Sequence, residues 1–212
     1  MEKIFAVWKP KGPTSHDVVN EVRRAFGERR VGHAGTLDPL AEGVLVLGVG
    51  REATRRLGSI VKKEKEYVAK IELGKESSTD DEEGEKTAFK NAVPPLSGEI
   101  KKVLESFIGE TDQVPPVYSA VKVRGEPAHR RIRRGETVEM KSRRVKIAEI
   151  ELLKYDWPRL SIRVVTGPGV YIRALARDIG RRLGVGGFLS SLTRTRVGEF
   201  TKEKTIPISE LP

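Results

Sequence analysis

Asp38 lies at the centre of a turn-rich stretch, residues 32–43, in which glycines and acidic residues precede an apolar run. Glycine permits tight or left-handed backbone, and Pro39 fixes the chain directly after the carboxylate. A loop of this kind can hold one carboxylate rigidly. An ordinary Asp-Pro turn contains the same residues, so this stretch alone leaves a catalytic and a structural interpretation open.

Composition argues against several classes of protein. The chain has 212 residues, 37% hydrophobic and 33% charged, as in globular proteins, and we expect one domain over residues 1–212. No apolar run approaches the ~18 residues of a membrane span, and the N-terminus has no secretory pattern. The chain has no cysteine and only three scattered histidines, which argues against disulfides and a metal site. We therefore expect the protein to act in a reducing cytoplasm.

Charge is distributed unevenly along the chain. The formal net charge is +10, and a basic chain suits a polyanionic partner because each phosphate contact releases counterions. Between Lys122 and Lys146 there are ten basic residues and three acidic ones. We expect a nucleic acid to dock on this segment, at about residues 124–146. The acidic residues from Glu76 to Glu85 would repel phosphate, so we expect them to face solvent.

The spacing of apolar residues predicts the main elements. Helical spacing, with capping residues and terminal glycines, predicts helices at residues 14–26, 52–61, 97–108 and 172–183. Alternating or continuous apolar runs predict strands at residues 4–8, 44–49, 65–73, 145–153 and 160–165, and a strand that ends near 123. Residues 128–134 could form a short helix with charge on every side.

One glycine pattern imitates a dinucleotide-binding fingerprint. Residues 48–53 lie between a predicted strand and a predicted helix, and Glu72 follows about where a ribose-binding acid would be expected. A single match of this kind is weak, and no series of alternating strands and helices follows it. A nicotinamide-dependent oxidoreductase is therefore a distant alternative.

Several side chains have both a structural and a functional interpretation. Lys9 and Lys11 lie beside a predicted helix start, where they could contact a phosphate or be solvated. Tyr67 begins the inward face of a predicted strand, as a core aromatic would. Arg173 lies near the start of a predicted helix, where the helix dipole disfavours a cation, so we expect an anion nearby.

The stretch Gly32-His-Ala-Gly-Thr-Leu-Asp-Pro-Leu-Ala-Glu-Gly43 resembles the signature loop of the TruB family of RNA pseudouridine synthases. Further segments resemble that family in the same order, at residues 9–15, 65–67, 74 with 79–84, 113–122, 171–173 with 176–180, and 192–196. The resemblance extends from about Lys9 to Phe200. It implies an α+β fold in which helices flank a mixed, mostly antiparallel central sheet.

The resemblance also implies a substrate and a reaction. The substrate would be a uridine in the T-arm stem-loop of transfer RNA. Isomerisation breaks the bond between ribose C1′ and uracil N1, turns the uracil and joins C5 to the same carbon, with no net redox change. We therefore expect no cofactor and no metal.

By the same resemblance, three residues carry the chemistry. Asp38 is the expected nucleophile, because an ionised carboxylate can add to C1′ or stabilise positive charge there. Arg173 is the expected partner of Asp38, and its charge would favour the ionised acid. Tyr67 is the aromatic expected to stack on the target base and to help remove the C5 proton.

Base extrusion and RNA docking involve further residues. A stacked base must leave its stack before an enzyme can act on it. By resemblance, His33 takes part in extrusion and RNA binding, and Tyr171 and Leu192 line the uridine pocket. The basic side chains expected to contact RNA are Lys9, Lys11, Arg131, Arg133, Arg134, Arg194 and Arg196. Relatives usually carry an aromatic-containing helix where residues 128–134 are markedly basic, so we expect docking there to differ.

We therefore expect a cytoplasmic, monomeric tRNA pseudouridine synthase that acts without a guide RNA. We expect no appended C-terminal RNA-binding domain, so basic patches would supply more of the affinity. The nearest alternative is a relative that acts on another RNA or with a guide, which the missing domain disfavours. The alternative from a different class is a non-catalytic RNA-binding or chaperone protein, and the presence of Asp38, Tyr67 and Arg173 counts against it.

Overall fold

The structure, a computed structural model, describes residues 2–212, and the chain divides into two compact units. The first unit comprises Met1–Val68, Val165–Pro168 and Leu192–Pro212, and the second comprises Ala69–Val164 and Gly169–Ser191. Each unit is thus assembled from segments that are distant in sequence. The strands that contribute residues to both units are β4 (Lys65–Leu73), β11 (Arg159–Thr166) and β12 (Gly187–Val197).

The first unit is built on a sheet with the strand order β14-β1-β3-β12. β1 (Lys3–Lys9) pairs antiparallel with β3 (Ala41–Val49), and so does β2 (Val31–His33). β3 pairs parallel with β12, and β1 pairs parallel with β14 (Thr205–Ile206). The remaining short elements of this unit are β13 (Phe200–Thr201), η1 (Lys202–Lys204) and η2 (Ile208–Glu210).

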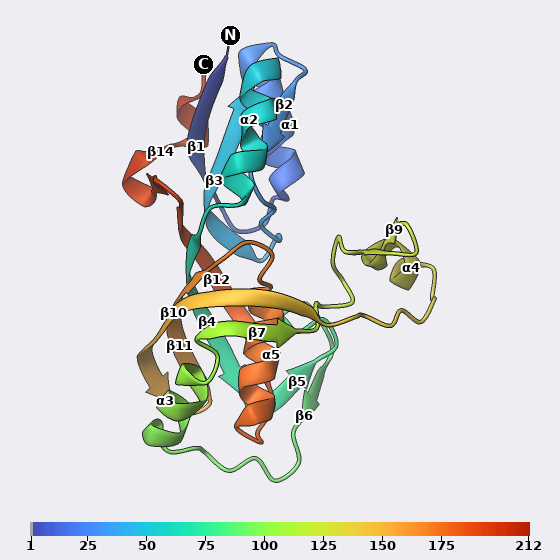
Figure 1. Cartoon of the computed structure of the whole chain (residues 1–212), viewed down its shortest axis with the longest axis vertical. Helices are drawn as coiled ribbons and strands as arrows, with labels where there is room; N and C mark the ends of the chain where they lie inside the picture. Colours follow the sequence, from blue (N-terminus) through green and yellow to red (C-terminus); the bar gives the residue numbers. More distant parts are fainter. Residues whose placement is uncertain (1) are drawn as a thin grey trace. The chain divides into compact units, whose positions relative to one another are not determined.

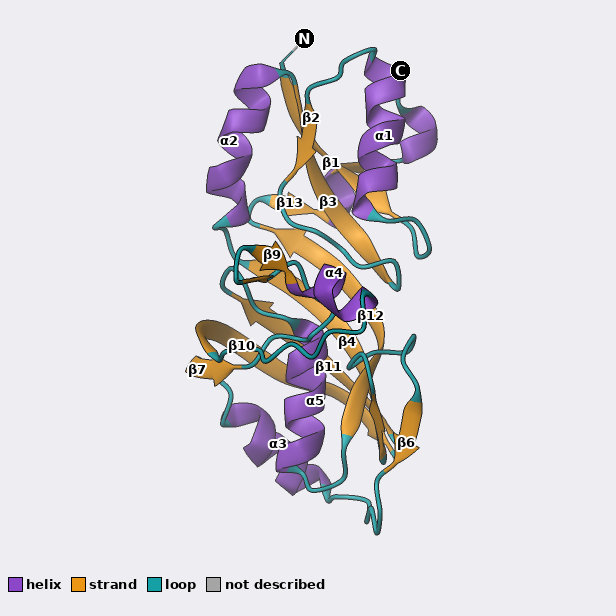
Figure 2. Cartoon of the chain, turned by 90° about the vertical axis from the view of Figure 1, so that its right-hand side faces the viewer, coloured by secondary structure: helices purple, strands orange, loops and turns teal. Residues whose placement is uncertain are grey.

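β3 is buried on both faces, as its continuous apolar run predicts, and Figure 2 shows this strand between two helices. Leu45 and Leu47 pack with the apolar face of α1 (Ser15–Phe26). Val44 and Val46, which point to the other face, pack with α2 (Arg51–Val61). The two helices therefore cover opposite faces of this sheet, and β3 is fixed between them.

The second unit contains the strand order β12-β4-β11-β10-β7. β10 (Arg143–Asp156) pairs antiparallel with β7 (Gly109–Gln113), and the helices of this unit are α3 (Ser97–Glu105), α4 (Ala128–Arg133) and α5 (Ile172–Arg182). Two hairpins complete it: β5 (Lys75–Ser77) with β6 (Lys86–Ala88), and β8 (Lys122–Val123) with β9 (Glu126–Pro127). Figure 1 shows β9 and α4 standing apart from the strands of this unit.

The predicted fold class is confirmed, because the sheet is mixed and antiparallel pairs outnumber parallel ones among the strand pairs described. Several strands differ from the prediction, and two of these differences have a clear cause. Pro115 and Pro116 keep the chain after β7 irregular, so only Lys122–Val123 forms a strand before the next turn. The long strand β12 was not predicted, because a buried arginine, Arg194, interrupts its apolar alternation.

The dinucleotide-binding alternative is wrong. Its fingerprint would place a pyrophosphate at the N-terminus of α2, but the carboxylate of Glu2 accepts a hydrogen bond from the Ala53 amide there, at 2.8 Å. The preceding strand β3 pairs antiparallel with β1, unlike the strands of a doubly wound sheet.

In residues 2–212, no helix is long and apolar enough to cross a membrane.

Candidate active site

The loop that carries Asp38 is anchored on both sides of the acid. The Ser15 hydroxyl donates to the Leu37 carbonyl at 2.9 Å and accepts from the Leu37 amide at 2.8 Å. The Gly12 amide donates to the Pro39 carbonyl at 2.8 Å. Thr14 caps α1, which leaves the buried Ser15 hydroxyl for the loop. The backbone around Asp38 is therefore held by the segment between β1 and α1.

Two buried cations complete this anchoring. Lys9, with no exposed surface, donates to the Ala41 carbonyl at 2.7 Å, and burial lowers its pKa while the charge of Asp38 raises it. Arg194, 1% exposed, donates to the carbonyls of Gly35 at 3.0 Å and Val44 at 2.8 Å. The prediction that Lys9 and Arg194 contact RNA is therefore corrected: both are enclosed and bind loop carbonyls, so a phosphate has no access to them. Lys11 is exposed and Arg196 is half-buried, as RNA contacts require.

Tyr67 is buried on β4, close enough to Arg194 to influence the pKa of that arginine. Burial lowers the pKa of Arg194, and Tyr67 raises it again. Lys65, two residues earlier on the same face, is buried and donates to the Val61 and Lys63 carbonyls at 2.8 and 2.9 Å. Burial, and then the charge of Arg194, lowers the pKa of Lys65 to about 8.

His33 and Leu192 also belong to the first unit. His33 ends β2, immediately before the Asp38 loop, and Leu192 is a buried residue of β12 that pairs with Ala41. Burial lowers the pKa of His33, and the charge of Arg194 lowers it further. The imidazole is consequently neutral at neutral pH, and a neutral ring enters an RNA stack with less desolvation than a charged one.

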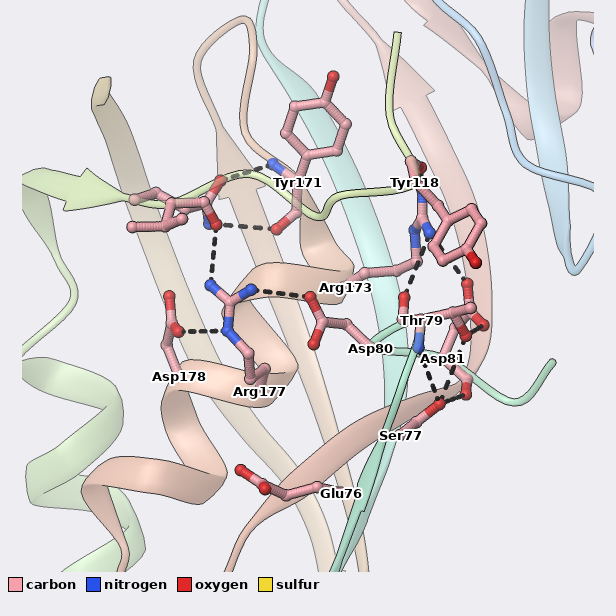
Figure 3. Close-up of polar contacts among 12 residues, drawn as sticks. Glu76, Ser77, Thr79, Asp80, Asp81, Tyr118, Tyr171, Arg173, Arg177 and Asp178 are labelled. Atoms are coloured by element: carbon pink, nitrogen blue, oxygen red, sulfur yellow. Dashed lines mark hydrogen bonds and ion pairs between the residues drawn. The ribbon is translucent and has the colours of Figure 1, made fainter. Parts of the chain in front are cut away.

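Arg173 begins a buried polar network in the second unit (Figure 3). Its guanidinium lies 3.1 Å from the carboxylate of Asp81 and donates to the Tyr118 carbonyl at 2.8 Å. Asp81, 3% exposed, also accepts from the Thr79 hydroxyl and from the Glu83 amide. The anion expected near the start of α5 is thus present within this unit. Asp81 lies in a segment that resembles the family, but sequence reasoning assigned it no role.

The acidic hairpin does not simply face solvent, and that prediction is wrong for Asp80 and Asp81 (Figure 3). Arg177, one turn after Arg173 on α5, lies 2.8 Å from Asp80, and burial raises the pKa of that acid against the lowering effect of Arg177. A further turn on, Arg181 lies 3.1 Å from Glu76 at a more exposed position. Successive turns of α5 therefore bind successive acids of the hairpin, from a buried pair to an exposed one.

Tyr171 lies directly before α5 and is positioned by its backbone. The buried side-chain amide of Gln113 accepts from the Tyr171 amide at 2.9 Å and donates to its carbonyl at 3.1 Å. The guanidinium of Arg143 lies 5.6 Å from the centre of the Tyr171 ring. The ring is thus fixed at its base, with a cation over its face. Sequence reasoning missed Gln113, whose contact joins residues distant in the chain.

The arginines in and directly after α4 fall into two groups. Arg131 lies 2.7 Å from Glu136, and Arg134 lies 2.6 Å from Glu126 and 2.7 Å from Glu136. Arg133 is exposed, and no ion pair with it is found among the described residues. Part of the charge predicted to contact RNA is therefore used to hold α4 and its hairpin together.

Among the predicted site residues, Asp38, His33 and Tyr67 belong to the first unit, where Asp38 raises the pKa of Lys9, Arg194 lowers that of His33, and Tyr67 raises that of Arg194. In the second unit, Tyr171 directly precedes α5 and Arg173 lies in its first turn. Among the side chains that the structure describes, no group of three or more histidines and acids is arranged to hold a metal ion. The first unit thus offers carboxylate, phenol and imidazole groups, and the second unit offers the guanidinium of Arg173.

Two family models match almost the whole chain. The model described as TruB family pseudouridylate synthase (N terminal domain) matches residues 23–172, and that of the tRNA pseudouridylate synthase B C-terminal domain matches residues 173–212. The chain belongs to the TruB family of pseudouridine synthases. Curated relatives carry the name tRNA pseudouridine synthase B. One from Thermobifida fusca (strain YX) is 49% identical over 98% of this chain and 73% of its own length. Another from Mycobacterium sp. (strain KMS) is 46% identical over 98% of this chain and 71% of its own length.

Solved structures show the same TruB-type fold. A chain of a Cbf5-Nop10-Gar1 complex superposes with a TM-score of 0.77 at 32% identity, covering 98% of this chain. A chain of an H/ACA RNP bound to a substrate RNA containing 2′-deoxyuridine gives a TM-score of 0.72 at 31% identity, again over 98% of this chain. This chain spans 53% and 51% of those two chains, about half of their length.

Proposed function

We propose that this TruB family member isomerises a T-loop uridine of transfer RNA to pseudouridine. The observation that carries the proposal is the 46–49% identity, over 98% of the chain, to curated enzymes named tRNA pseudouridine synthase B. The anchored carboxylate of Asp38 gives the proposal a chemical basis, because an acid held by its neighbours keeps its position as the substrate changes shape.

Asp38 acts at ribose C1′ in this proposal. As the bond from C1′ to N1 breaks, positive charge develops at C1′, and a carboxylate there either adds to the carbon or stabilises that charge. Arg173 is the proposed partner of Asp38, on the strength of the family's motif. Asp81 supports this role, because its buried carboxylate orients the guanidinium before substrate binds.

The uridine must leave its stack before C1′ becomes accessible, and this costs a few kcal/mol. We assign the extrusion step to His33 and the lining of the uridine pocket to Tyr171 and Leu192. The RNA backbone is bound by exposed cations of both units, among which Lys11 and Arg133 are the best placed. We further propose that the protein is cytoplasmic and monomeric, and that the whole chain forms one catalytic domain.

A guide-dependent reaction is the second candidate, because solved structures with this fold include a chain of an H/ACA RNP. The identity to that chain is 31%, below the 46–49% shared with the relatives named for tRNA. The comparison therefore favours a tRNA substrate that is recognised without a guide.

The substrate is tested with the full chain and three RNAs. These are an unmodified tRNA transcript, its isolated T-arm stem-loop, and a stem-loop of the same composition with a scrambled loop, with pseudouridine mapped by carbodiimide probing. We expect one modified position, the T-loop uridine, in the first two RNAs and none in the third. Modification that appears only after a complementary guide RNA is added would favour the second candidate.

A further inference from the structure

Arg143 is an exposed cation whose position is not explained by an ion pair. It lies in the basic segment, at the residue where β10 begins. Among the side chains that the structure describes, no carboxylate forms an ion pair with it. Its guanidinium instead lies 5.6 Å from the centre of the Tyr171 ring, within the range over which a cation and an aromatic face attract each other. The cation is therefore directed at a residue of the proposed uridine pocket.

The pairing of β7 with β10 places this cation. Arg143 lies directly opposite Gln113 in the antiparallel pair, and opposite residues project from the same face of a sheet. The side-chain amide of Gln113 accepts from the Tyr171 amide at 2.9 Å and donates to the Tyr171 carbonyl at 3.1 Å. Two residues at one position of the sheet therefore contact Tyr171, one at its backbone and the other at its ring.

The ring of Tyr171 is held less firmly than its backbone. It points away from the ion pairs that Arg177 makes on α5 (Figure 3). Hydrogen bonds to the backbone leave the side-chain torsions of this half-buried residue free to change between rotamers. Among the described residues, the polar contact found for the ring itself is the one with Arg143. A cation over one face restricts the ring and leaves the opposite face for a base.

We propose that Arg143 is a positioning residue that holds the Tyr171 ring in the orientation that receives the target uridine. The inference rests on the proposed function, in which Tyr171 lines the uridine pocket, and deepens it. Arg144 is the matched control. As the next residue of the strand it projects from the other face, where it lies 3.3 Å from Glu110. Both arginines are exposed, so they differ mainly in the contact with the ring.

The first experiment separates positioning from a contact with the RNA backbone. We would compare wild type, Arg143→Gln, Arg143→Lys and Arg144→Gln on the T-arm stem-loop. The single-turnover rate is measured at saturating RNA, and the binding constant and its salt dependence are measured by fluorescence anisotropy. We expect Arg143→Gln to lower the rate by about 4-fold, the effect of one lost cation–π contact, with unchanged binding and salt slope. Arg143→Lys keeps a cation and should restore the rate, and Arg144→Gln should change none of the three quantities.

Three results would overturn the inference. The first is an unchanged rate for Arg143→Gln, and the second is equal slowing by Arg144→Gln. The third is a smaller salt slope for Arg143→Gln, which would make this arginine a contact of the RNA backbone. A wild type that is inactive on the stem-loop would instead contradict the proposed function.

A double-mutant cycle tests whether the effect passes through the ring. Tyr171→Phe keeps the aromatic face and Tyr171→Leu removes it. Arg143→Gln should slow Tyr171→Phe by about 4-fold again and should have no further effect on Tyr171→Leu. Equal slowing in the two backgrounds would show that Arg143 acts elsewhere and would overturn the inference.

Fluorine NMR keeps the inference testable if Tyr171→Leu has no measurable turnover. The chain has four tyrosines, so 3-fluorotyrosine labels four sites, and Tyr171→Phe identifies the signal of Tyr171. We expect Arg143→Gln to shift or broaden that signal in the protein without RNA, and Arg144→Gln to leave it unchanged. A Tyr171 signal that is the same in wild type and Arg143→Gln would overturn the positioning role.

Discussion

Burial gives single residues of this chain properties that their types alone do not indicate. Lys9, Lys65 and Arg194 are cations, yet all three are enclosed and bonded to backbone carbonyls. Those of Lys9 and Arg194 include carbonyls of the Asp38 loop, and those of Lys65 lie at the end of α2. Such charges hold the loop, because losing a buried donor leaves its carbonyl partners unsatisfied. The loop of Asp38 is therefore anchored in part by Lys9 and Arg194, two residues that the sequence predicted to contact RNA.

Lys65 gives a pH-dependent test of this burial. Its pKa is about 8 in the folded chain and 10.5 is its ordinary value. Between these pH values the unfolded chain binds more protons, so the free energy of unfolding rises with pH, by up to about 3 kcal/mol across the window. Wild type should become more stable relative to Lys65→Met from pH 8 to 10.5, measured by urea unfolding. Lys62→Met, at an exposed site, is the control. If the free energies of unfolding of wild type and Lys65→Met changed with pH in parallel, the lowered pKa of Lys65 would be contradicted.

At the scale of elements, α5 and the acidic hairpin form one structural unit. Arg173, Arg177 and Arg181 face Asp81, Asp80 and Glu76 in turn. The inner two pairs are largely enclosed, whereas the third is exposed and contributes little. The start of α5, which carries Tyr171 and Arg173, is consequently fixed by contacts with the hairpin.

Asp81→Asn tests this arrangement. The change removes the charge but keeps the shape, so the buried guanidinium of Arg173 loses its ion pair with Asp81. We expect the free energy of unfolding to fall by about 3 kcal/mol, with a loss of turnover as Arg173 becomes less ordered. Glu83→Gln, at an exposed position of the same hairpin, should change neither quantity. Equal stability of the two variants would show that the buried pair contributes nothing net.

The sequence predicted elements better than it predicted long-range polar contacts. Helix α1 and strand β3 follow directly from local periodicity, since capping and apolar spacing are local properties. Asp81 and Gln113 could not be assigned in this way, because their partners are 92 and 58 residues distant in the chain. β12 was missed for a related reason. Arg194 is a charged residue at an inward-facing position of this strand, and its carbonyl partner Val44 is distant in the chain.

At the scale of the whole molecule, a net charge of +10 predicts salt-dependent RNA binding. In and directly after α4, Arg131 and Arg134 pair with Glu126 and Glu136, whereas Arg130 and Arg133 are exposed and have no ion pair among the described residues. Only the second group is available to phosphate without breaking an internal pair. In and next to α4, we therefore expect Arg130 and Arg133 to contact RNA.

We expect Arg130→Ala with Arg133→Ala to weaken T-arm binding and to reduce the slope of log K against log salt by about one per lost phosphate contact. The matched pair Arg131→Ala with Arg134→Ala should instead destabilise α4 and its hairpin, detected as faster amide exchange in that segment. Binding is measured by fluorescence anisotropy at several salt concentrations. An unchanged slope in the first pair would place the RNA backbone elsewhere on the molecule.

Asp38→Asn, compared with wild type on an unmodified tRNA transcript, tests the central claim most directly. The substitution preserves the size of the side chain and removes the ionised carboxylate. Wild type should convert the T-loop uridine, and Asp38→Asn should yield no pseudouridine above the background of enzyme-free RNA while still binding the transcript. Equal conversion by the two proteins would contradict the account.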